Sequence, residues 1–113
     1  MTRSVNPATV AVRAAIESDT QFGAVVPSLH LSSNYTFSGL GEKRQYDYTR
    51  SGNPTRDALA ATLAVLEGGT AATVTSSGMA ALNLVVQLLQ PGDLLIAPHD
   101  CYGGTYRLLE NLA

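Results

Sequence analysis

The sequence is short of charged residues. Only 14% of its 113 residues are charged and the formal net charge is -2, while 45% are hydrophobic. A typical soluble domain is about 25% charged. No cluster of lysine and arginine marks a nucleic-acid-binding face, which excludes that class of protein. Because a free-standing small domain needs a charged surface, we expect this chain to belong to a larger core or to an oligomer interface.

Other absences bear on the cellular compartment of the protein. Cys101 is the only cysteine, so no disulfide can form within the chain. No apolar run approaches the ~20 residues that span a membrane, and the first residues lack the apolar stretch of a secretory signal. We therefore expect a cytoplasmic protein. No second ligand lies at metal-binding spacing near His30, so no metal site is predicted.

The stretch from Thr70 to Tyr102 has the pattern of a strand–helix–strand unit. Ala71–Thr75 is a short apolar run with β-branched residues, and Leu94–Ala97 is a second one. Between them, a helix is predicted over 76–89, and Pro91, Gly92 and Asp93 end it. Such βαβ units are right-handed and have parallel strands. The sequence therefore predicts an α/β fold.

Residues that could bind an anion follow both predicted strands. The turn Ser76–Met79 and the loop His99–Gly104 leave the carboxyl ends of parallel strands, and ligands bind at that edge. Gly78 allows close approach, and the first helical turn has free N–H groups at the positive end of its dipole. With Tyr102 nearby, we infer a phosphate that carries a flat ring. The alternative is a simple Ser cap and a half-buried loop tyrosine.

Helices are also predicted on either side of an irregular segment. Asn6 and Pro7 are typical of a helix start before Ala8–Ile16, and Pro54–Glu67 forms an alanine-rich helix. Gln21–Ser51 has no regular period, which favours a binding loop or arm. Thr105–Ala113 looks like the beginning of a helix without a cap, so we expect the chain to stop within an element.

Tyr48 and Arg50 stand out in this segment because no structural role explains them. Two residues apart on an extended stretch, they would point to the same side. A phenol and a guanidinium can both bind a phosphate or carboxylate. A surface arginine beside a packed tyrosine is an equally good interpretation of these two residues. Asn53 and Pro54, in contrast, are explained as the cap and first residue of the next helix.

Three stretches together resemble the Cys/Met-metabolism family of pyridoxal-phosphate enzymes of fold type I. They are Tyr48–Thr55, then Glu67–Gly69 with Ser76–Ala81, then Asp100–Arg107, and the resemblance extends over nearly the whole chain. It implies an N-terminal helix and intersubunit arm over 1–53. Residues 54–113 would then be the first βαβ portion of the large domain, which binds the cofactor.

The resemblance also implies roles for single residues. Gly78 and Met79 would give backbone N–H groups to the phosphate of pyridoxal 5'-phosphate. Tyr102 would stack on the cofactor ring and assist proton transfer at the substrate amine, which makes it the predicted catalytic residue. Tyr48 and Arg50 would reach the phosphate of a neighbouring subunit's cofactor. The chain would therefore work as a homo-oligomer, a dimer of dimers.

The implied reaction is a γ-replacement in transsulfuration and methionine biosynthesis. Succinate leaves Cγ of O-succinyl-L-homoserine and the sulfur of cysteine takes its place, with Arg107 near the distal acyl group. Lyases and sulfhydrylases of the family share these motifs and stay open as alternatives. The reaction needs a lysine to carry the cofactor, and the only one, Lys43, lies outside every motif. We therefore expect a longer enzyme and an inactive isolated chain.

Two further classes also remain open at this point. One is a non-catalytic module that binds a phosphorylated ligand on the strand–helix–strand unit. The other is a structural or interaction fragment without any ligand, which would associate through its apolar helix surface.

Overall fold

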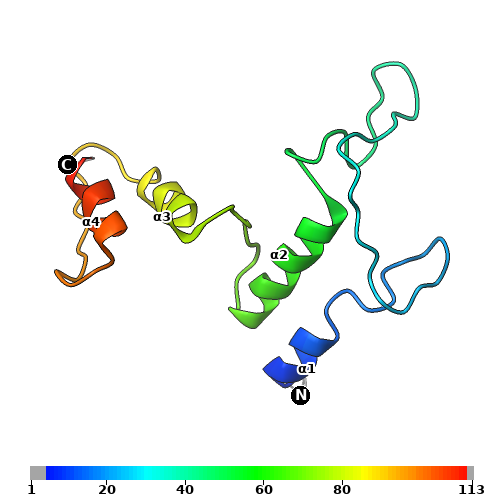
Figure 1. Cartoon of the computed structure of the whole chain (residues 1–113), viewed down its shortest axis with the longest axis horizontal. Coiled ribbons are helices and arrows are strands. Elements are labelled where there is room, and N and C mark those ends of the chain that lie inside the picture. Colours follow the sequence, from blue (N-terminus) through cyan, green and yellow to red (C-terminus); the bar gives the residue numbers. More distant parts are fainter. Residues whose placement is uncertain (1–4, 112–113) are drawn as a thin grey trace. The chain divides into compact units, whose positions relative to one another are not determined.

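The computed structural model describes residues 5–111, which form four helices and no extended β-sheet (Figure 1). The chain divides into two compact units, one up to Thr73 and one from Val74 onward. Each unit is described separately below. The predicted domain boundary at residues 53 and 54 refers to the larger enzyme, and it stays a prediction.

In the first unit, α1 comprises Pro7–Val12, and the Asn6 side chain accepts the Ala8 N–H at 2.9 Å. The predicted cap is therefore present, but the helix ends before the predicted Ile16. Ala15 and Glu17 have φ values of 53° and 62°, in the left-handed region that interrupts an α-helix. The Glu17 N–H donates instead to the Val25 carbonyl at 3.2 Å.

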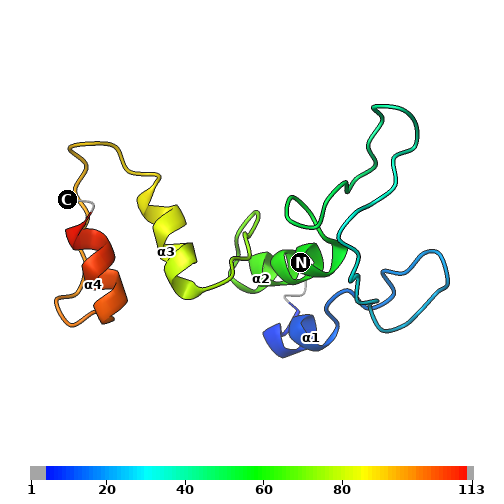
Figure 2. The same ribbon diagram turned by 45° about the horizontal axis from the view of Figure 1, so that its top comes forward.

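The second helix of this unit, α2, comprises Pro54–Leu66, almost as predicted. It ends where Gly68 takes a φ of 67° and the Gly69 N–H donates to the Ala64 carbonyl at 2.8 Å. Glycine adopts this left-handed conformation without a steric penalty, so it ends helices well. The helices α1 and α2 lie side by side, as Figures 1 and 2 both show.

The segment between these helices is irregular, as predicted. Its only β-type pairings within residues 5–111 are isolated bridges, Asn34 with Tyr48 and Gly39 with Glu42. The first bridge joins the two ends of the loop through the Tyr35 N–H and the Asp47 carbonyl, which are 2.9 Å apart. This bridge positions Tyr48 for the site described below.

The second unit contains α3, Gly78–Val86, and α4, Gly103–Glu110. The Ser77 hydroxyl accepts the Ala80 N–H at 3.1 Å and so caps α3. α3 is shorter than the predicted helix over 76–89, because the backbone N–H groups of Leu88 and Leu89 bond three residues back rather than four. α4 begins two residues before the predicted Thr105, and residues 112 and 113 of that prediction lie outside the described range.

The strand predictions for Ala71–Thr75 and Leu94–Ala97 are not confirmed. Both segments lack strand structure, and no backbone hydrogen bond among residues 5–111 joins either one to a neighbouring segment. A β-strand exists only where a second strand pairs with its N–H and C=O groups. The βαβ arrangement is thus not confirmed within residues 5–111, although its helix and both of its turns form.

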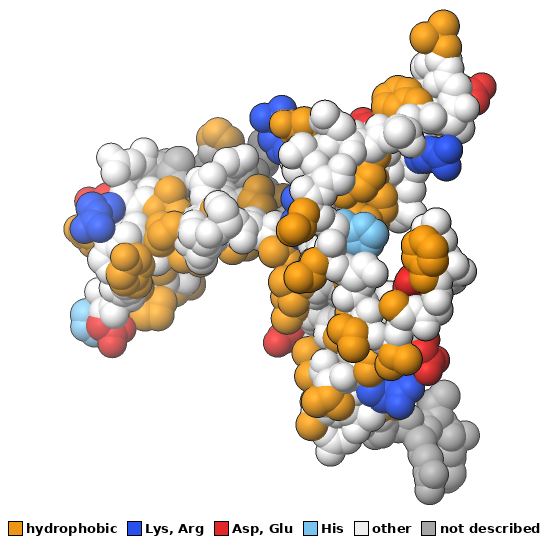
Figure 3. All heavy atoms as spheres, turned by 45° about the vertical axis from the view of Figure 1, so that its right-hand side comes forward, with side chains coloured by type: hydrophobic (Ala, Val, Ile, Leu, Met, Phe, Trp, Pro, Cys, Tyr) orange, Lys and Arg blue, Asp and Glu red, His pale blue; other side chains and the backbone are white. Residues whose placement is uncertain are grey.

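Very little of the described chain is buried. Only Ala64 and Asn53 among residues 5–111 fall into the buried class, with 7% and 8% of their surface exposed. Large apolar side chains such as Leu31, Leu94 and Ile96 are more than four-fifths exposed, and hydrophobic side chains cover much of the face drawn in Figure 3. In the described range, no helix is both long and apolar enough to cross a membrane.

Candidate functional site

Tyr48 and Arg50 lie on a tight turn, not on the extended stretch that was predicted. The Tyr48 carbonyl accepts the N–H groups of Ser51 and Gly52 at 3.0 and 3.1 Å. The Arg50 guanidinium carbon lies 5.1 Å from the centre of the Tyr48 ring, within range of a cation–π contact. The structure therefore brings the two side chains together, but on a turn and not on an extended stretch.

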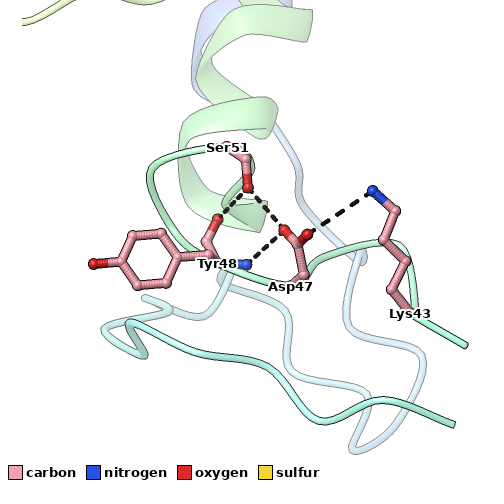
Figure 4. A network of polar contacts seen from close by, with 4 residues as sticks. All are labelled: Lys43, Asp47, Tyr48 and Ser51. Atoms are coloured by element: carbon pink, nitrogen blue, oxygen red, sulfur yellow. Dashed lines mark hydrogen bonds and ion pairs between the residues drawn. The ribbon is translucent and has the colours of Figure 1, made fainter. Parts of the chain in front are cut away.

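The Asp47 carboxylate holds this turn from one side (Figure 4). Its Oδ1 accepts the Tyr48 N–H at 2.7 Å and the Ser51 hydroxyl at 2.8 Å, and Lys43 Nζ lies 3.8 Å from Oδ2. These bonds, the Ser51 hydroxyl first and the Tyr48 N–H second, lower the pKa of Asp47 below its ordinary value. The Tyr48 ring points away from this network and is 42% exposed, so its hydroxyl can meet a ligand.

Arg56, in the first turn of α2, holds the same turn from the other side. Its Nη1 donates to the Thr49 carbonyl at 2.9 Å, and its Nη2 donates to the Arg50 carbonyl at 3.3 Å. A charged donor makes a stronger bond than a neutral one. The backbone that carries Arg50 is thereby fixed to the helix, while the Arg50 side chain stays exposed.

The buried Asn53 connects the turn, the arm and α2. Its Oδ1 accepts the Thr55 N–H at 2.9 Å, which is the predicted cap. Its Nδ2 also donates to the His30 carbonyl at 3.0 Å and to Thr49 Oγ1 at 2.9 Å, with Tyr35 Oη 3.3 Å away. Capping explains only one end of this amide. Its partners His30 and Tyr35 are remote in sequence, so the cap signal could not reveal them.

The second unit supplies a helix N-terminus with free donors. The N–H groups of Gly78 and Met79 donate no hydrogen bond within residues 5–111, and Gly78 is exposed. The Ser77 hydroxyl is already used in capping Ala80. Two free N–H groups at the positive end of a helix form a natural place for a phosphate.

Met79 and Tyr102 meet at the beginning of α4. The Thr105 hydroxyl lies 4.0 Å from Met79 Sδ, and the Tyr102 ring lies over Gly104, with 72% of Tyr102 exposed. The turns before α3 and α4 thus come together, as predicted, although no sheet holds them. Tyr102 caps α4 through its backbone alone, which leaves its phenol free.

Arg107 lies one turn along α4, and its side chain folds back toward the start of the helix. Its Nη1 would be 3.7 Å from a Cβ atom built at Gly103. Arg107 is exposed, and its guanidinium makes no hydrogen bond or ion pair within residues 5–111. Within residues 5–111, no cluster of His, Cys, Asp and Glu side chains could hold a metal ion.

The second unit thus has two unpaired N–H groups and an aromatic side chain near helix starts, and the first unit has an arginine–tyrosine pair on a turn. The family described as Cys/Met metabolism PLP-dependent enzyme matches residues 8–113. The chain belongs to this family, whose members use pyridoxal 5'-phosphate.

Two relatives differ in their sequence identity to the chain. The chain is 57% identical over 107 residues to cystathionine gamma-synthase of Escherichia coli, which covers 94% of the chain and 28% of that protein. It is 41% identical to a cystathionine beta-lyase of Lactococcus lactis over 92% of the chain and 27% of the relative. The chain thus spans little more than a quarter of the length of these relatives.

A solved structure has the same backbone course. Cystathionine gamma synthase from Xanthomonas oryzae, crystallised in complex with cystathionine, superposes with a TM-score of 0.88 at 59% identity, covering 96% of this chain and 28% of that one. Such structural neighbours are fold type I enzymes. The predicted fold type is confirmed at this level.

Proposed function

We propose that this chain is the N-terminal part of a cystathionine γ-synthase, an enzyme that replaces the succinate on Cγ of O-succinyl-L-homoserine with the sulfur of cysteine. The observation that carries the proposal is the 57% identity to a cystathionine gamma-synthase, compared with 41% for the cystathionine beta-lyase relatives. The crystallised synthase at 59% identity supports the same choice over a cystathionine gamma-lyase at 37%.

The two free N–H groups on α3 support pyridoxal 5'-phosphate as the cofactor of this chain. In the proposal, Gly78 and Met79 donate to the cofactor phosphate, and Tyr102 stacks on its ring. The structure fits this assignment because the donors are unpaired within residues 5–111 and the ring of Tyr102 lies close to Met79. When bound, the cofactor supplies an electron sink for the carbanion chemistry of amino-acid substrates.

Tyr102 and Arg107 act on the substrate in this proposal. The Tyr102 hydroxyl transfers a proton at the substrate amine. The absence of a capping hydrogen bond from the Tyr102 side chain to α4 supports this role. Arg107 binds the distal succinyl carboxylate through its unpaired guanidinium, a group suited to carboxylates. Both residues lie within the first two turns of α4 or directly before it.

Tyr48 and Arg50 reach the cofactor phosphate of a neighbouring subunit in this proposal. The turn that carries them exposes a phenol and a guanidinium side by side while Asp47 and Arg56 hold its backbone. Residues 1–53 then act as an intersubunit arm and residues 54–113 begin the cofactor domain. The enzyme would be a homo-oligomer.

A product assay tests the proposed reaction. The intact enzyme that carries this segment is incubated with O-succinyl-L-homoserine and L-cysteine, and cystathionine and succinate are quantified by mass spectrometry. We expect equal amounts of both products. A parallel incubation with cystathionine alone gives the rate of lyase activity.

The alternative function is a lyase of the same family, and the 41% identity to cystathionine beta-lyase is what favours it. It predicts faster breakdown of cystathionine than formation. That result would overturn the synthase assignment but not the family.

A further inference from the structure

The start of α4 contains two adjacent glycines whose surroundings differ. Neither has a positive φ, so the backbone alone would accept a side chain at both positions. A Cβ atom at Gly103 would meet only Arg107 Nη1, at an ordinary 3.7 Å. A Cβ atom at Gly104 would lie 2.5 Å from Cε1 and 3.1 Å from Cδ1 of Tyr102.

These distances are too short for Tyr102 to stay where it is. Non-bonded carbon atoms reach optimal contact at about 3.5–4.0 Å, so any side chain at Gly104 must displace the ring. Met79 Sδ, 3.1 Å from the same Cβ position, sits on a flexible side chain and can yield. A tyrosine ring is rigid and moves as a whole by rotating about χ1 and χ2. Tyr102 is 72% exposed, so the ring has open space into which it can be displaced.

We propose that Gly104 is a positioning residue for Tyr102, whose ring occupies the space that a side chain at position 104 would fill. The inference rests on the proposed function, in which the Tyr102 ring stacks on the cofactor and its hydroxyl transfers a proton. Gly104 touches neither the cofactor nor the substrate in this proposal. It acts by leaving room for the ring beside the first turn of α4.

The two glycines form a matched pair for an experiment. Both occupy the first turn of the same helix, so helix propensity favours alanine at either site. Gly103→Ala is therefore the control for the effect of alanine on the helix, because its Cβ would make only an ordinary 3.7 Å contact with Arg107 Nη1. Each variant is made in the intact enzyme that carries this segment, loaded with pyridoxal 5'-phosphate, in the wild-type and in a Tyr102→Ala background.

The expected result is specific to position 104. Gly104→Ala should lower kcat/KM for O-succinyl-L-homoserine on the order of 100-fold, the typical effect of misplacing a reacting group by about 1 Å. It should also change the visible circular dichroism of the bound cofactor, which reports the groups stacked on its ring. Gly103→Ala should leave both measurements at wild-type values.

The Tyr102→Ala background separates a positioning role from a merely structural one. If Gly104 acts through the ring, Gly104→Ala should add no further loss in kcat/KM and no further change in the dichroism there. An equal loss in both backgrounds would overturn the inference, because the effect would then come from helix or backbone damage.

Two other outcomes would also overturn it. If Gly104→Ala and Gly103→Ala behave alike while Tyr102→Ala loses activity, the proposed function stands and the role of Gly104 is wrong. If Tyr102→Ala itself keeps full activity and an unchanged dichroism spectrum, the role of Tyr102 in the proposed function fails together with the inference.

Discussion

Replacing Arg56 tests whether the turn that carries Tyr48 and Arg50 must be held rigid. Arg56→Met keeps most of the side-chain length but removes two hydrogen bonds, at 2.9 and 3.3 Å, to the backbone of the turn. A hydrogen bond from a charged donor contributes ~1.5–3 kcal/mol. Because Arg56 is only half-buried and its second bond is long, we take the lower end, about 1.5 kcal/mol, for the pair. Without these bonds, binding the cofactor must also order the turn.

The expected result is about a tenfold rise in the dissociation constant of pyridoxal 5'-phosphate, since ~1.4 kcal/mol corresponds to a factor of ten. Equilibrium dialysis of the intact enzyme, followed by cofactor absorbance, measures this constant. Arg44→Met is the matched control, because Arg44 is exposed and its side chain makes no hydrogen bond or ion pair within the described range. If both variants weaken binding equally, the loss of charge is responsible and the reasoning about the turn is wrong.

Three further predictions follow from the same contacts. Tyr102→Phe should sharply reduce turnover while the cofactor stays bound; unchanged turnover in a product assay would contradict the proton-transfer role. Asn53→Ala should destabilise the start of α2 by about 1–3 kcal/mol, since it removes a cap and leaves the His30 carbonyl without its donor. Faster amide exchange in the first turn of α2 would show this, and wild-type exchange would refute it. Because the folded-state pKa of Asp47 is lowered, its stabilising effect is present above the ordinary carboxyl pKa of about 3.9 and is lost as pH falls through the lower folded value. Thermal melts below about pH 4 should therefore lose stability less steeply in Asp47→Asn than in wild type, and identical slopes would count against this network.

The starts of α1, α2 and α3, which have side-chain caps, could be predicted to within two residues because their causes are local. Asn6, Asn53 and Ser77 each use a side-chain oxygen to accept an N–H two or three residues further on. The end of α1 could not be predicted in this way. The helix ends at Val12, and Ala15 and Glu17 follow it in left-handed conformations although neither is glycine or asparagine, the residues that usually adopt them.

The two strand predictions were not confirmed for the opposite reason, since a strand depends on partners elsewhere in the sequence. Ala71–Thr75 and Leu94–Ala97 have the composition of strands but find no neighbour within residues 5–111. The proximity of the turns before α3 and α4 was nevertheless predicted, because the turns themselves form.

The supporting residues of the site were missed by sequence reasoning. Arg56 acts on backbone carbonyls six and seven residues away, and no motif signals such contacts. Asp47 carries a weak signal, because an Asp side chain at a turn often accepts a nearby backbone N–H, as Asp47 Oδ1 does from Tyr48. The Asn53 amide was recognised only as a cap, since its remaining partners depend on the course of the arm.

The most direct test of the account is complementation between subunits. Its central claim is that one cofactor site takes Tyr102 from one subunit and Arg50 from another. Arg50→Ala and Tyr102→Phe subunits are prepared separately as intact enzymes, mixed under conditions that exchange subunits, and assayed for cystathionine formation. We predict that the mixture is far more active than either parent, because some of its sites combine a native Tyr102 with a native Arg50. Activity that stays at the average of the two parents, with subunit exchange verified by mass spectrometry, would contradict the claim.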